Sequence, residues 1–99
     1  MTNPGVELVI VDGRPTVRGE CDLATAGDIE AWLDSFDVPM LEVDLSGVSF
    51  IDSSGLKAFL NARRRNANMR VVEPSAAVMR LLQITGTYRF LVEGTGTDC

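Results

Sequence analysis

The chain has 99 residues, of which 45% are apolar and 23% are charged. This is the composition of one globular domain, and it excludes collagen-like and disordered chains. Nine Lys and Arg stand against 14 Asp and Glu, so the net charge is -5 and binding to nucleic acid or anionic lipid through charge alone is disfavoured. His is absent, which excludes Ser-His-Asp and Cys-His nucleophile arrangements and every metal site that needs a His ligand.

The cysteines and the N-terminal sequence indicate in which cellular compartment the protein is found. Cys21 and Cys99 have neither metal-ligand nor redox spacing, which favours free thiols in a cytoplasmic protein over a disulfide in a secreted one. The N-terminus lacks a basic region followed by an apolar run, and no stretch of about 18 apolar residues occurs. We therefore expect a cytoplasmic protein without cofactor, metal or membrane partner. It should fold as a single domain over residues 1–99, with a core at about residues 6–92 and flexible ends.

The first elements follow from the hydrophobic pattern. An apolar run at residues 6–11 and the segment at residues 14–18 flank Asp12-Gly13, a dipeptide typical of a two-residue β-hairpin. Apolar residues at helical spacing then predict a helix over about residues 24–37. Residues 40–45 alternate between apolar and polar, which predicts a strand that ends in a short loop.

The later elements continue an alternation of strands and helices. We expect a helix that begins near Ser53, a strand at residues 69–72, a helix from Pro74-Ser75 to Gly86, and a last strand at residues 89–92. This order predicts an α/β fold. Its mixed sheet is opened by an antiparallel hairpin, has parallel later strands, and packs against about three helices.

Basic residues concentrate late in the chain, at Arg63, Arg64, Arg65 and Arg70. One interpretation is a solvated helix end, where cations complement the helix dipole, and the other is docking against an acidic partner. Direct nucleic-acid binding is not expected, because the short basic patch lacks interleaved aromatic residues.

The residues that could carry chemistry gather where the second helix begins. Asp52, Ser53, Ser54 and Gly55 bring one carboxylate, two hydroxyls and a glycine to that point. A purely structural interpretation is an N-cap made by Asp52 or Ser53, which contributes about 0.5 to 2 kcal/mol to stability. Local chemistry alone does not decide between this cap and a functional site.

The flanking segments add a family resemblance. Together with Gly19-Glu20-Cys21-Asp22 upstream and residues 71–75 and 81–86 downstream, residues 44–56 resemble the STAS domain of bacterial anti-sigma factor antagonists. The resemblance implies a regulatory protein and not an enzyme. Such a protein binds an anti-sigma factor of the serine-kinase type while unphosphorylated and is switched off when Ser53 is phosphorylated. A phosphatase that acts on phospho-Ser53 would be a second partner. The partner-binding residues implied by the resemblance are Asp22, Asp52, Ser53, Ser54, Gly55, Leu56 and Lys57.

A phosphoserine at this position suits the local physics. A phosphate at a helix N-terminus meets unpaired N–H groups and the positive end of the dipole, so we expect phosphorylation of Ser53 to alter binding and not folding. The added charge of ~1.5 to 2 units would repel a partner surface shaped for a neutral hydroxyl. Lys57, four residues on, is either a partial partner of the phosphate or a solvated lysine.

Other functions and two departures from the family pattern stay open. STAS domains also occur as accessory subunits of lipid or anion transport complexes, which is the alternative function, and nucleotide binding at the helix start is a further one. Cys21 replaces the usual aliphatic residue, either as a redox handle or as a small buried hydrophobe. The chain ends soon after Val92, where relatives continue into another helix, so weak self-association over uncovered apolar surface is expected.

Overall fold

A mixed five-stranded sheet organises the molecule. The computed structural model describes residues 2–3 and 5–95. The strands lie in the order β1 (Thr2–Asn3), β2 (Val6–Val11), β3 (Arg14–Cys21), β4 (Leu41–Ile51) and β5 (Met69–Val72). The first three strands pair antiparallel, whereas β3, β4 and β5 pair parallel. This confirms the predicted α/β fold with an opening hairpin and parallel later strands.

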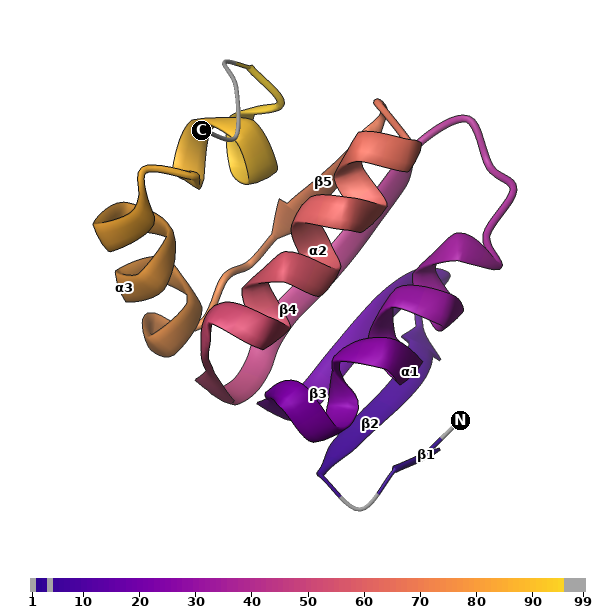
Figure 1. Cartoon of the computed structure of the whole chain (residues 1–99). Coiled ribbons are helices and arrows are strands. Elements are labelled where there is room, and N and C mark those ends of the chain that lie inside the picture. The colour runs from indigo at the N-terminus through magenta and orange to yellow at the C-terminus, as the bar shows by residue number, and fades with distance from the viewer. Residues whose placement is uncertain (1, 4, 96–99) are drawn as a thin grey trace.

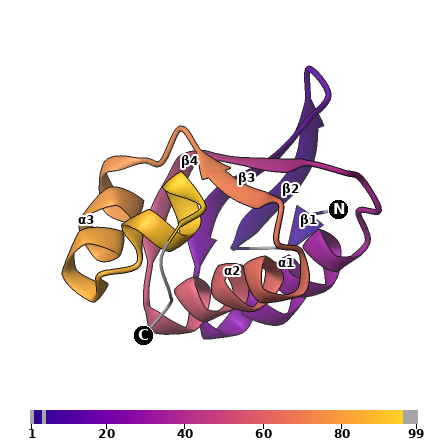
Figure 2. The same ribbon diagram turned by 90° about the horizontal axis from the view of Figure 1, so that it is seen from above.

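In the described residues, three α-helices and one short π-helix accompany the sheet: α1 (Leu23–Asp34), α2 (Ser53–Arg65), α3 (Ala76–Thr85) and η1 (Arg89–Glu93). Helices α1 and α2 lie side by side on one face of the sheet, and α3 and η1 lie past its β4–β5 side (Figures 1 and 2). The core fills the space between the sheet and these helices, with Phe59 of α2 and Ile29 of α1 among its largest fully buried side chains. No helix within residues 2–3 and 5–95 has the length and apolar character needed to cross a bilayer.

The hairpin between β2 and β3 follows its turn residues. Asp12 has φ 52° and Gly13 has φ 78°, and two consecutive positive φ angles are what a type I′ turn requires. Val11 pairs with Arg14, so the loop contains two residues as predicted. Strand β3 then continues through Cys21, beyond the predicted end at residue 18.

Strand β4 is longer than the sequence pattern predicts. It runs to Ile51, so the expected loop after residue 45 is wrong. The pairing with β3 shifts register at two places, and each shift inserts one extra residue in β4. The buried positions Leu45, Val48 and Ile51 are therefore three residues apart, which hides the two-residue period of a strand.

The last predicted strand is also wrong, because residues 89–92 belong to η1. Leu91 is buried, and η1 contacts β5 and α2. Arg63 of α2 donates hydrogen bonds to the carbonyl oxygens of Phe90 and Gly94, both at 3.3 Å, and lies 4.7 Å from the centre of the Phe90 ring. In a strand, such carbonyl groups would accept hydrogen bonds from a neighbouring strand. Here the Arg63 side chain donates these hydrogen bonds instead.

Two of the three arginines at the end of α2, Arg63 and Arg65, bind residues of neighbouring helices. Besides the contacts of Arg63, Arg65 forms ion pairs with Glu30 at 2.6 Å and Asp34 at 2.9 Å, both on α1. The hydrogen bond from Arg65 lowers the pKa of Glu30. Arg63 and Arg65 thus tie α2 to its neighbours, and Arg65 remains exposed at the helix end, as the interpretation of a solvated helix end predicts.

Candidate functional site

Two helices begin next to each other at one edge of the sheet. Cys21, the last residue of β3, pairs in register with Ile51, the last residue of β4. Helices α1 and α2 start two residues after this pair, which brings Asp22 and Asp52 to the same edge. The backbone N–H of Asp52 donates to the carbonyl oxygen of Cys21 at 3.1 Å and fixes this arrangement. Carboxyl ends of parallel strands are the usual position of functional sites in α/β folds.

Both aspartates cap the helices that they precede. Oδ1 of Asp52 accepts hydrogen bonds from the backbone N–H groups of Ser54 at 2.9 Å and Gly55 at 3.0 Å. Oδ1 of Asp22 accepts from the N–H groups of Ala24 at 3.0 Å and Thr25 at 3.2 Å. Two residues were predicted as possible N-caps of α2, and the structure has Asp52 and not Ser53 in that position. The cap holds the start of α2 without help from the serine hydroxyl.

Ser53 is the first residue of α2, and its side chain is exposed. Its position gives the hydroxyl access to solvent at the end of the helix where backbone N–H groups point outward. Lys57, one turn further on, is also exposed, whereas Ser54 is half-buried. Asp22 is half-buried at the neighbouring helix start.

Gly55 and Leu56 point into the protein instead of to the surface. Leu56 is a buried core residue. Gly55 lies against the end of β3, where an added Cβ would overlap the carbonyl group of Cys21, at 2.6 Å from the carbonyl carbon. Gly55 and Leu56 set how closely α2 approaches β3. This placement of the helix leaves Ser53 and Lys57 on the surface.

Cys21 lies beneath the two helix starts and is fully buried. Burial, and to a smaller extent the nearby charges of Asp22 and Asp52, raise the pKa of its thiol to about 12. A thiol that stays neutral and buried is inert, which favours the interpretation as a small buried hydrophobe over a redox handle. Cys99 lies outside the described residues. Within the described part of the chain, no group of three or more His, Cys, Asp or Glu could hold a metal ion.

Two exposed apolar side chains at the same edge were not predicted from the sequence. Leu23, the first residue of α1, is 80% exposed, and Phe50 near the end of β4 is 47% exposed. Phe50 was missed because residues after Leu45 were expected to form a loop. Leu23 lies just before the predicted helix over residues 24–37, and as the first residue of α1 it turns outward.

Comparisons of the sequence and of the structure with known proteins point to the same family. Residues 11–93 match the family model described as "Mlab, STAS domain". Two curated relatives, the anti-sigma-B factor antagonists of Listeria monocytogenes and Listeria innocua, are each 35% identical over 77 residues, which is 71% of this chain and 68% of the relative. Among solved structures, an anti-sigma factor antagonist from Mycobacterium paratuberculosis has a TM-score of 0.72 at 26% identity, covering 92% of this chain and 87% of that one. The anti-sigma factor antagonist SpoIIAA in its unphosphorylated form shares the fold, with a TM-score of 0.64 at 23% identity over 89% of this chain and 86% of that one.

Proposed function

Because the chain belongs to the STAS domain family of anti-sigma factor antagonists, which are regulatory binding proteins and not enzymes, we propose that it binds an anti-sigma factor through the surface around Ser53. This anti-sigma factor is a serine kinase. It is captured while Ser53 is unphosphorylated, which frees a sigma factor, and it is released once it phosphorylates Ser53. The protein acts in the cytoplasm, where transcription takes place.

The observation that supports this switch is the exposed position of Ser53 beside an independent cap. Since Asp52 already accepts from the N–H groups of Ser54 and Gly55, modification of the Ser53 hydroxyl removes no helix-capping bond. A phosphate there also meets the positive end of the α2 dipole, which favours a negative charge. The fold can therefore carry either form of the serine. The same exposure lets a phosphatase reach the phosphoserine.

The charge of a phosphate is large enough to release a partner. At a separation of ~6 Å and an effective dielectric constant of ~20, each unit of like charge costs about 3 kcal/mol. A phosphoserine carries ~1.5 to 2 negative charges, and screening by salt reduces the sum. The remaining repulsion weakens binding by roughly two or more powers of ten. Lys57 offsets part of this charge from one turn away.

A titration of charge variants tests the switch. Ser53→Asp should bind purified candidate anti-sigma factors at least about tenfold more weakly than the wild type, because the aspartate adds one of the phosphate's charges. Ser53→Ala should bind as the wild type does but accept no phosphate when incubated with ATP and the partner. Asn68→Asp is the matched control, since it adds one negative charge at an exposed turn at the far end of α2. Equal affinity of Ser53→Asp and Asn68→Asp would contradict the proposed switch.

The alternative function is an accessory subunit of a lipid or anion transport complex. It is kept as a second candidate because the matched family model is described by Mlab and not by an antagonist. In that setting Ser53 need not be phosphorylated. Co-purification with an ATPase subunit, at equal yield for the wild type and Ser53→Asp, would favour it.

A further inference from the structure

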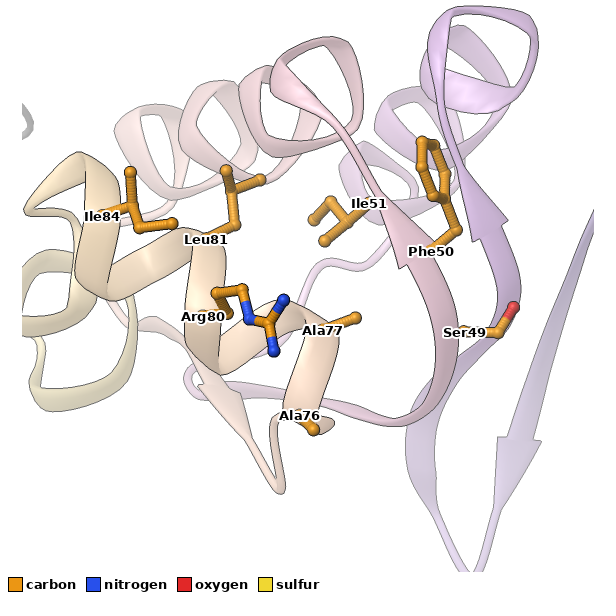
Figure 3. Close-up of a pocket in the computed structure, with 8 residues that line it drawn as sticks. All are labelled: Ser49, Phe50, Ile51, Ala76, Ala77, Arg80, Leu81 and Ile84. Carbon is orange, nitrogen blue, oxygen red and sulfur yellow. The ribbon is translucent and has the colours of Figure 1, made fainter.

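A groove of about 360 Å³ lies between the end of β4 and helix α3. It is open to solvent, and its walls are mainly apolar: Phe50, Ile51, Ala77, Leu81 and Ile84 line it, together with Arg80. In Figure 3, Ile51 of β4 and Leu81 of α3 lie across from each other, and Phe50 and Ile84 lie at the two ends of the groove. The groove exists because β4 continues to Ile51, so that the last strand residues face α3.

Two large apolar side chains that line the groove are exposed. Ile84 is 74% exposed and Phe50 is 47% exposed. Exposed apolar residues that are scattered singly need no explanation, but two that border one groove are typical of a surface that another molecule covers. A pocket of this kind receives the anchoring side chain of a partner in many protein interfaces.

Arg80 gives the groove a positive charge. Its guanidinium lies on the groove side of α3 (Figure 3) and forms no ion pair or hydrogen bond with any residue that the structure describes. By contrast, Arg14, Arg18 and Arg65 each pair with a carboxylate. In a chain with a net charge of -5, an arginine left unpaired beside an apolar groove matches a ligand with an acidic group next to an apolar one.

We infer that this groove is the anchor pocket for the anti-sigma factor, which inserts an apolar side chain between Phe50 and Ile84 and pairs an adjacent carboxylate with Arg80. The inference rests on the proposed function and names the second part of its interface. Phe50 and Ile51 run directly into Asp52 and Ser53, so the groove and the serine belong to one continuous edge.

The openness of the groove favours a protein over a small molecule as the occupant. A small-molecule site encloses most of its ligand, whereas this groove would leave much of a free ligand in water. A side chain that belongs to a docked protein is held by the remainder of the interface as well.

The test measures the affinity of variants for an anti-sigma factor that binds the wild type. Ile84→Ala and Arg80→Glu should each raise the dissociation constant at least about tenfold. The matched controls are Ile10→Ala, another largely exposed isoleucine, near the hairpin end, and Arg89→Glu, the same charge change in η1. Both controls should stay within about twofold of the wild type. Circular dichroism verifies that the variants are folded.

The outcomes separate this inference from the proposed function. If Ile84→Ala and Arg80→Glu bind as tightly as the controls while Ser53→Asp binds weakly, the anchor pocket is refuted and the serine switch stands. If Ser53→Asp binds like the wild type while the groove variants bind weakly, the switch fails and the groove is confirmed as a contact. If no kinase-type anti-sigma factor binds the wild type, both fail. A wild-type dimer in sedimentation that Ile84→Ala dissolves would assign the groove to a second copy and overturn the inference.

Discussion

Gly55 shows how a single atom decides where the switch serine lies. Its missing Cβ lets α2 approach the carbonyl group of Cys21, and this contact sets the position of Ser53 two residues earlier. A side chain here has to displace backbone atoms and cannot rotate away.

We expect Gly55→Ala to lower the free energy of unfolding by at least about 2 kcal/mol, because overpacking against backbone strains the β3–α2 contact. Gly27→Ala is the matched control: Gly27 is exposed within α1, and an added Cβ meets nothing within 4 Å. That variant should gain roughly 0.5 to 1 kcal/mol from helix propensity. Urea unfolding of both proteins measures the difference. Equal stabilities would show that the close approach has no energetic consequence.

Cys21 links stability to alkaline pH. Burial and two carboxylates raise the pKa of the folded thiol to about 12 from 9.0, so the folded state keeps its proton where the unfolded state loses it. The stability that this contributes is fully present below pH 9 and is lost as the pH rises from 9 to 12. Between about pH 8 and about pH 10, the free energy of unfolding should fall by about 1.4 kcal/mol more in the wild type than in Cys21→Ala. Urea titrations at the two pH values measure this, and equal losses would mean that the thiol does not titrate in this way.

Elements that carry their own end signals were predictable from sequence. Asp12-Gly13 supplies both positive φ angles of the hairpin, and Ser75 and Gly86 cap the two ends of α3. Each of these residues acts on backbone within a few positions, so no tertiary information is needed.

Elements that depend on a distant partner were not predictable. The two register shifts in β4 exist only against β3, and they replace the two-residue period by buried positions three residues apart. Phe90 of η1 and Gly94, which follows η1, accept hydrogen bonds from Arg63, 27 and 31 residues away. The candidate site divides in the same way: Asp52 and Ser53 are local signals, and Asp22 was expected only through the family resemblance. The groove requires the full length of β4.

Across the whole molecule, α2 joins the candidate site to the last described segment. Ser53 lies at its first residue, and Arg63 near its other end holds η1 through two hydrogen bonds and the Phe90 ring. Leu91 of η1 is buried, so this segment completes the core beside β5. The contacts of Arg63 with η1 and the proposed switch at Ser53 are therefore separated by the length of α2.

We expect Arg63→Ala to loosen η1 without affecting the switch. Each lost hydrogen bond costs about 1 kcal/mol and the ring contact roughly 0.5 to 1 kcal/mol, so amide exchange across residues 89–94 should accelerate at least about tenfold. Arg63→Lys keeps a cation near the ring but lacks the planar guanidinium that reaches both carbonyl oxygens. Amide exchange across residues 89–94 in this variant should therefore be intermediate. Arg89→Ala is the control, because Arg89 pairs with Glu93 inside η1 and does not hold it to α2. Hydrogen exchange followed by mass spectrometry reads each segment separately. Unchanged exchange in Arg63→Ala would show that burial of Leu91 alone holds η1, and a loss of anti-sigma factor binding in the same variant would show that the two ends of α2 are not independent.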